Sequence, residues 1–155
     1  MVQETAYLRE LQQGFADTVV RGGSNPREFS VIFTNPQATL AAVRAISGLA
    51  RQLSAHISIV DARVVPYPLA LEHPAADVGF LRRSALMLAL RASEDVDVQI
   101  HFCRDRAVTL NAVLKEDAIV VLAGRKRWWQ TAEQRLARML QHGRRTVFLV
   151  YPTLL

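Results

Sequence analysis

Apolar and polar residues alternate along the chain in blocks that predict strands and helices in turn. Segments 29–34 and 57–65 are rich in β-branched and aromatic side chains, which is typical of strands. Segment 96–102 alternates apolar with polar residues, 118–123 is continuously apolar, and 146–151 is again rich in β-branched and aromatic residues. The pattern therefore predicts five strands. The continuous run is the one expected at the centre of a sheet, buried on both faces.

Helical periodicity fills the intervals between these strands. Asn35 is a good N-cap and Pro36 suits a first helical turn, so a helix is expected from there to about Ser54. Asp105 is expected to cap another helix. The remaining helices are predicted over residues 76–93, 105–115 and 130–141.

Strict alternation of strands and helices indicates a mostly parallel sheet with helices on both faces. Residues 1–20 also have helical spacing, and a Gly- and Pro-containing stretch then breaks it. We divide the chain into an N-terminal helical arm and linker, 1–28, and an α/β domain, 29–155. The arm could pack on the domain, cross to a partner subunit or link to an upstream segment.

Composition fits one globular domain, with 50% hydrophobic and 21% charged residues in a chain of 155. The single cysteine, Cys103, excludes a disulfide framework and is expected to be a buried thiol. The sequence offers no apolar run long enough to span a bilayer, and its first residues are charged rather than apolar. These features predict a cytoplasmic protein.

Positive charge is concentrated in the last third of the chain. Residues 1–103 hold nine cations and ten anions, whereas residues 104–155 hold ten cations and four anions. Such a field attracts phosphates or other anions, although it also serves solubility. The pair Arg144–Arg145 is interpreted as a solvated terminus or an interface rim.

Three stretches of the chain resemble the universal stress protein family. The first is the strand-turn-helix opening at 31–36, and the second is the strand 56–62, which runs into a Pro-containing loop. The third is the ending, with 118–125, the helical 136–140 and the strand 144–150. The resemblance covers about residues 29–151.

This resemblance implies an α/β fold with an open five-stranded parallel sheet of order 3-2-1-4-5. Helices would cover both faces, in a Rossmann-like arrangement similar to adenine nucleotide alpha hydrolases. Ligands of such sheets bind beyond the carboxyl ends of the strands, where the strand order reverses. The candidate ligand-binding residues of this crevice are Thr34, Asn35, Asp61, Gly124, Arg125, Lys126 and Arg127.

The family's ATP motif, Gly-x-x-Gly followed nine residues later by Gly-Ser or Gly-Thr, is not kept. Alignment of the strand end puts Ala123 and Lys126 at the two glycines and Leu136 at the third. Since glycines let backbone amides approach phosphate, ATP binding in the family's manner is not expected. ATP or AMP at a modified phosphate site stays an alternative, and no cofactor is assigned.

The stretch Arg125-Lys126-Arg127-Trp128-Trp129 could replace the lost backbone cradle by direct charge. The alternative is that the cations are solvated while one Trp packs in the core. Asp61, at the end of the second strand, could hydrogen-bond a ribose hydroxyl or pair with a nearby Arg.

No catalytic constellation and no metal-ligand spacing can be named, and nucleic acid is not an expected partner. We therefore expect a non-catalytic binding or regulatory domain that takes a small anionic ligand. The alternative is a soluble regulatory domain of a membrane transporter. The resemblance also suggests a homodimer that pairs the last strand, through Val147, Phe148, Leu149 and Val150.

Overall fold

The computed structural model describes residues 28–72, 80, 83, 84, 87, 95–124, 131–141 and 145–151. Nearly all of the predicted arm, most of the predicted helix 76–93, and the basic stretch 125–127 with its two tryptophans lie outside the described residues. The arm was predicted to reach residue 28, but the first strand already begins at Glu28. Among the described helices, none is both long and apolar enough to cross a membrane.

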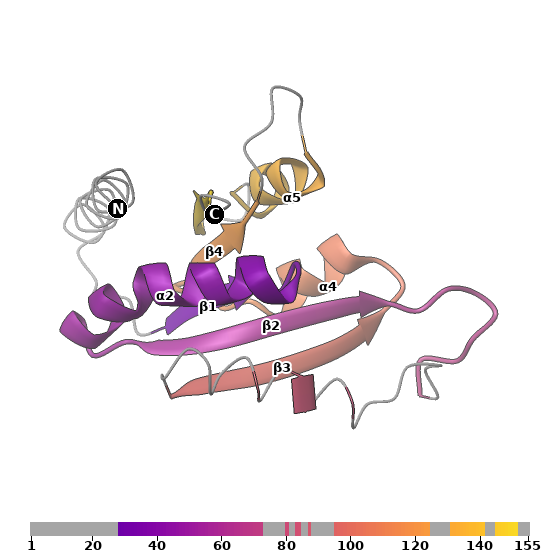
Figure 1. The fold of residues 1–155 in the computed structure, drawn as a ribbon. Coiled ribbons are helices and arrows are strands. Elements are labelled where there is room, and N and C mark those ends of the chain that lie inside the picture. Colours follow the sequence, from indigo (N-terminus) through magenta and orange to yellow (C-terminus); the bar gives the residue numbers. More distant parts are fainter. Residues whose placement is uncertain are drawn as a thin grey trace.

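Five parallel strands form one sheet of order β3-β2-β1-β4-β5, which confirms the predicted order 3-2-1-4-5 (Figure 1). All four strand pairings are parallel, as the alternation of strands and helices predicts. In chain order the elements are β1 (Glu28–Ile32), α2 (Pro36–Gln52), β2 (His56–Val64), β3 (Val96–Cys103), α4 (Arg106–Val113), β4 (Ile119–Ala123), α5 (Ala132–Gln141) and β5 (Thr146–Val150).

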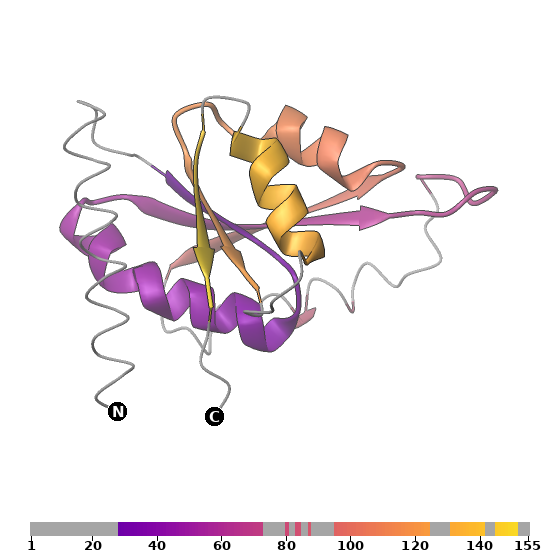
Figure 2. The same ribbon diagram turned by 90° about the horizontal axis from the view of Figure 1, so that it is seen from above.

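Helices cover both faces of the sheet, with α2 on one side and α4 and α5 on the other (Figure 2). The apolar stripe of α2, including Val43, Ile46 and Ala50, packs on one core cluster. Leu110 of α4 and Leu140 of α5 belong to the opposite cluster. All five residues of β4 are buried, as its continuous apolar sequence predicts.

Two helix starts follow the predicted capping. Asn35 Oδ1 accepts a hydrogen bond from the amide of Ala38 at 2.9 Å. Asp105 Oδ1 accepts from the amides of Ala107 and Val108 at 2.9 and 3.0 Å. These caps fix where each helix begins relative to the strand before it.

The strands end at different levels on the carboxyl edge of the sheet. The β1–β2 ladder ends where Ile32 lies opposite Val60, whereas the β2–β3 ladder continues to Val64 opposite Cys103. The strand predicted over 57–65 is observed as His56–Val64, so Asp61 lies inside β2 and not at its end, where the sequence analysis placed it. The unequal lengths leave one side of β2 without a neighbouring strand beyond Val60.

Arg145 is buried, with 9% of its surface exposed, so the interpretation of Arg144–Arg145 as solvated is wrong for this residue. Its guanidinium donates to Asn111 Oδ1 at 2.5 Å and to the carbonyls of Asn111 and Leu114 at 2.7 and 2.9 Å. The last carbonyls of a helix lack intrahelical partners, so the end of α4 provides acceptors for this cation.

A buried polar cluster lies near the start of β1. Glu28 Oε1 accepts from Ser58 Oγ at 2.9 Å and from Ser30 Oγ at 3.4 Å, and Glu28 Oε2 pairs with Lys115 Nζ. Burial raises the pKa of Glu28, but hydrogen bonds from Lys115 and Ser58 and the charge of Lys115 outweigh it and lower the pKa below 4.5. The folded state therefore favours the ionised carboxylate.

We expect Lys115→Met to lower the melting temperature at pH 7, because it leaves the Glu28 carboxylate buried without its cation. A lowered pKa gives stability that is present above the unfolded value of 4.5 and is lost as pH falls through the folded pKa. The difference between the wild type and the variant should therefore shrink in acid. Thermal melts from pH 7 to pH 3, with exposed Arg138→Met as the control, measure this, and a constant difference would contradict it.

Candidate functional site

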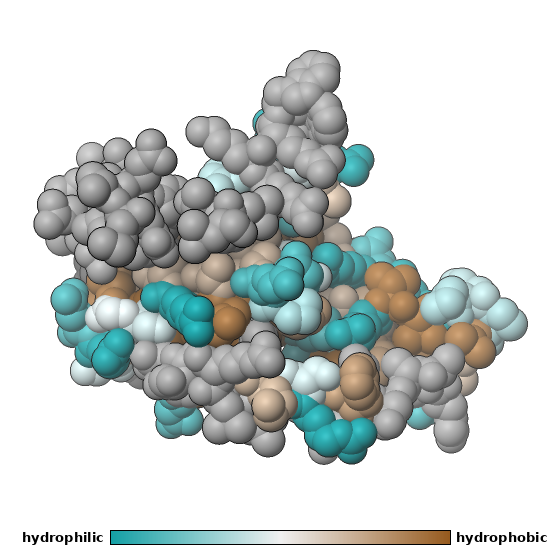
Figure 3. All heavy atoms as spheres, viewed as in Figure 1, coloured by the Kyte–Doolittle hydropathy of each residue, from teal (hydrophilic) through white to brown (hydrophobic). Residues whose placement is uncertain are grey.

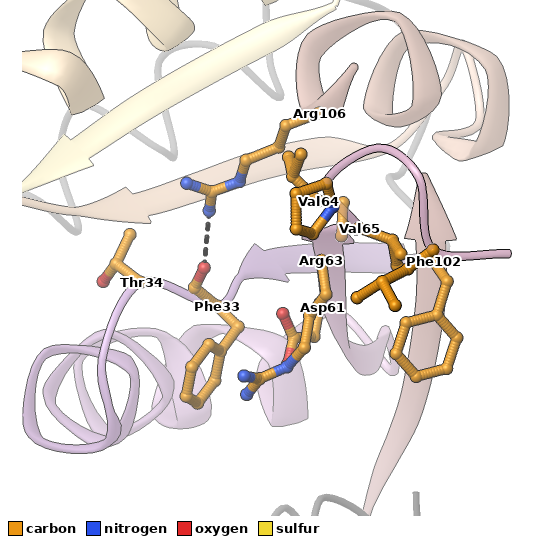
Figure 4. Close-up of a pocket in the computed structure, with 11 residues that line it drawn as sticks. Phe33, Thr34, Asp61, Arg63, Val64, Val65, Phe102 and Arg106 are labelled. Atoms are coloured by element: carbon orange, nitrogen blue, oxygen red, sulfur yellow. Dashed lines mark hydrogen bonds and ion pairs between the residues drawn. The ribbon is translucent and has the colours of Figure 1, made fainter. Parts of the chain in front are cut away.

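A pocket of about 450 Å³ opens at the carboxyl edge of the sheet, beside the part of β2 that β1 leaves uncovered (Figure 4). Its walls come from the residues after β1, the end of β2, the segment that follows β2, the end of β3 and the first turn of α4. The lining residues are Phe33, Thr34, Asp61, Ala62, Arg63, Val64, Val65, Pro66, Leu69, Phe102 and Arg106.

Backbone groups of β2 face this pocket. The amide of Phe33 donates to the carbonyl of Val60 at 2.9 Å, so Val60 directs its polar groups toward β1. Strand alternation directs the N–H and C=O of Ala62 to the same side, where β1 has already ended. Within the described part of the chain, neither group has a hydrogen-bond partner. The pocket thus presents one donor and one acceptor from a rigid strand.

Two oppositely charged side chains of β2, Asp61 and Arg63, form an ion pair in the pocket. Arg63 Nε donates to Asp61 Oδ2 at 2.8 Å, and the Arg63 guanidinium carbon lies 5.6 Å from the centroid of the Phe33 ring. Asp61 is only 8% exposed. Burial raises the pKa of Asp61, and the charges of Arg63 and Arg106 offset only part of that effect.

Arg106 supplies a second cation from the first residue of α4. Its Nη2 donates to the carbonyl of Phe33 at 2.6 Å, which fixes the guanidinium over the end of β1. Its Nε is buried and has no hydrogen-bond partner among the described residues. A buried donor without a partner costs free energy, so an acceptor placed here would be bound favourably.

Two backbone groups at the end of β4, beside the point where the strand order reverses, form hydrogen bonds within the protein. Thr34 Oγ1 donates to the carbonyl of Ala123 at 3.3 Å. The amide of Gly124 donates to the carbonyl of Val150 at 2.9 Å and continues the β4–β5 ladder. The Ala123 carbonyl and the Gly124 amide are therefore engaged within the protein, whereas the pocket lies on the β2 side of β1.

The predicted ligand-binding residues are only partly brought together. Thr34 and Asp61 line the pocket. Asn35 caps α2, and Gly124 is buried, with Glu133 of α5 beside it. The residues 125–127 lie outside the described residues.

Arg106 was missed by the sequence reasoning, and Arg63 was not among the candidate ligand-binding residues, although pairing of Asp61 with a nearby Arg was one of the two expectations for Asp61. Arg63 lies two residues after Asp61 in the same strand, so strand alternation alone puts both side chains on one face. Arg106 follows the cap Asp105 just after β3, and this position also lies at the carboxyl edge of the sheet. Strand alternation and the position after a capping residue could therefore have pointed to these two arginines, but neither belongs to a known ligand-binding motif.

The expected burial of Cys103 is confirmed, since its exposed fraction is 4%. Its Sγ contacts the carbonyl of Arg63 at 3.4 Å. His101 lies two residues earlier on the same strand, and its Nε2 is buried without a hydrogen-bond partner within the described ranges. No group of three His, Cys, Asp or Glu residues gathers among the residues that the structure describes.

β5 forms one edge of the sheet and pairs with β4. Val147, Phe148 and Leu149 are partly buried, and Val150 is fully buried. Strand alternation directs the polar groups of Val150 toward β4, as its bond with Gly124 shows, so those of Val147 and Leu149 face away from the sheet.

Comparison with known proteins gives structural matches alone, because no family model and no curated protein sequence matches the chain. One similar solved structure is a protein from the universal stress protein family from Burkholderia pseudomallei, with a TM-score of 0.54 and 19% identity over 83% of this chain and 98% of that one. Another is a universal stress protein in complex with cAMP, with a TM-score of 0.50 and 16% identity over 81% of this chain and 98% of that one. Together with the strand order, these matches show that the chain has the fold of the universal stress proteins.

Proposed function

We propose that the chain is a universal-stress-protein-like, non-catalytic binding module whose pocket takes a mononucleotide such as AMP or cyclic AMP. The observation that carries the proposal is the set of groups around one pocket: two guanidinium groups, two aromatic rings and an open backbone donor–acceptor pair. A mononucleotide combines an anion, a flat apolar body and a polar edge. Cyclic AMP in a solved structure of the same fold supports this choice.

Each part of such a ligand has a complementary group. The rings of Phe33 and Phe102 lie on either side of Asp61 and Arg63 (Figure 4). An apolar body among these rings gains contact area, and the backbone of Ala62 offers hydrogen bonds to a polar edge. The free Nε of Arg106 is suited to a phosphate oxygen.

The charge of the pocket favours a small anion over a triphosphate. Arg63, Arg106 and Asp61 are its charged lining residues, which gives one net positive charge when all three are ionised. A cyclic nucleotide carries about one negative charge, whereas ATP carries about four, and additional phosphates need further donors. The amide of Gly124 is already bonded to Val150 and offers no such donor.

A binding role without turnover is proposed because the described residues that line the pocket include no unpaired general base. Asp61 is the one carboxylate among them, and it is paired with Arg63. We also place the protein in the cytoplasm, where a reduced thiol such as the sole cysteine, Cys103, persists.

Arg106→Ala should weaken binding of cyclic AMP by at least about tenfold, because it removes the guanidinium whose unpartnered Nε is proposed to donate to the phosphate. Arg106→Lys should retain part of the affinity, and the exposed Arg138→Ala should bind as the wild type does. Isothermal titration calorimetry with cyclic AMP, AMP, ATP and inorganic phosphate measures this, and thermal melts establish that each variant is folded. Equal affinity of the Arg106→Ala variant, or tight binding of ATP with Mg²⁺, would overturn the proposal.

Asp61→Asn should tighten cyclic AMP binding by about three- to tenfold at neutral pH, because it removes the carboxylate beside the bound anion. The raised pKa of Asp61 sets the sign of the pH dependence. Below that pKa the carboxyl group is neutral, so wild-type affinity falls as pH rises through it, whereas the affinity of the variant does not. Affinity is measured against pH for both proteins, and the difference between the two curves removes the effect of protonation of the ligand. Parallel curves would rule out this role for Asp61.

We further propose that the module forms a homodimer through β5. The outward-facing backbone of Val147 and Leu149 and the apolar side chains of this edge strand support the proposal, since an apolar edge without a strand partner among the described residues favours association. A second copy could pair with this edge about a two-fold axis.

Val147→Pro should shift the dimer toward monomer, because it removes an outward N–H without removing a bond to β4. Val147→Ala, which keeps the N–H, should remain dimeric. Sedimentation velocity over a range of concentrations measures the shift. A wild-type monomer at high concentration, or an unchanged dimer in Val147→Pro, would refute pairing through β5.

A further inference from the structure

The segment 65–69, called the strap here, forms one wall of the pocket. It follows β2 directly and contributes Val65, Pro66 and Leu69 to the lining. At its start the amide of Val65 donates to the carbonyl of Cys103 at 2.8 Å, and at its end the amide of Leu69 donates to the carbonyl of Pro66 at 3.1 Å. These bonds join the strap to the sheet at one end and close a turn at the other.

One side chain holds the strap along its length. Arg104, the residue after β3, donates from Nη1 to the carbonyl of Val65 at 2.7 Å and from Nη2 to the carbonyl of Leu69 at 2.5 Å. Its guanidinium carbon also lies 4.1 Å from the centroid of the Tyr67 ring. Arg104 therefore contacts both ends and the middle of the strap.

Little apolar burial supplements this cation. Val65 is buried, but residues 66–69 are exposed, including Tyr67 at 81% and Leu69 at 39%. Hydrophobic side chains lie on the surface at the end toward which β2 and β3 point, as Figure 3 shows. Since burial is slight and the strap is held by polar bonds near solvent, its local opening should cost much less than global unfolding.

We propose that the strap is a movable wall of the pocket and that Arg104 is the positioning residue that latches it. The latch assignment stands on the unliganded protein, and its link to ligand entry rests on the proposed function. Opening the strap moves Val65, Pro66 and Leu69 away from the pocket, which widens the route for a ligand with a flat apolar body. A bound ligand that contacts these residues favours the closed strap, so occupancy and strap order are coupled.

Hydrogen exchange on the unliganded full-length protein tests the latch. Arg104→Ala should speed exchange of the Val65 and Leu69 amides by at least about tenfold, because both carbonyl contacts to the guanidinium are lost. Arg104→Lys should give an intermediate rate, since an ammonium group cannot span both carbonyls. Tyr67→Phe, which keeps the ring face, and Arg138→Ala should match the wild type. Unchanged exchange in Arg104→Ala would overturn the latch.

Stopped-flow binding of cyclic AMP tests the gate. If the strap controls entry, Arg104→Ala should raise the association rate and raise the dissociation rate more, so that affinity falls. A merely structural role predicts faster dissociation with an unchanged association rate, and that result would overturn the gate. Added cyclic AMP should also slow strap exchange in the wild type. Failure of the wild type to bind any nucleotide would refute the proposed function, whereas the exchange result in unliganded protein would still decide the latch.

Discussion

The pocket depends on a difference in strand length. β1 ends opposite Val60, while β2 and β3 continue together to Val64 and Cys103. Parallel strands satisfy their backbone groups through their neighbours, so a strand that outlasts one neighbour presents unpaired groups on that side. Because β2 is longer than β1, the Asp61–Arg63 pair lies beyond the end of β1, and the strap begins directly after Val64. The unpaired backbone groups of Ala62, the Asp61–Arg63 pair and the position of the strap thus all follow from the greater length of β2 and β3.

Three buried or half-buried arginines, Arg104, Arg106 and Arg145, differ in what their guanidinium groups bind, because they lie at different places in the fold. The guanidinium of Arg145 donates hydrogen bonds to carbonyls at the end of α4. Arg104 is bonded to strap carbonyls, whereas Arg106 keeps one buried donor without a partner within the described residues. Of these three described arginines, two are therefore structural and one keeps a donor for recognition.

Much of the fold could be predicted from local sequence. The continuous apolar run predicted the buried central strand, and Asn35 and Asp105 predicted two caps, because burial on both faces and capping are set by a few neighbouring residues. The strand order required the family resemblance, since pairing of distant strands leaves little local trace. The candidate site was harder. Thr34 and Asp61 were found because they lie near the carboxyl ends of β1 and β2. Arg106, in contrast, reaches Phe33 across 73 positions of the chain through a contact that periodicity does not encode.

The bond from the Gly124 amide to the Val150 carbonyl has a consequence for redesign. In a glycine-rich phosphate loop, the first amides after the strand must point to the ligand. Here the first such amide extends the ladder between β4 and β5, and Thr34 holds the preceding carbonyl. The Gly124 amide therefore cannot contribute to a triphosphate cradle while it is bonded to Val150. The end of β4 would first have to separate from β5, so a redesign that adds glycines after the strand must also break this bond.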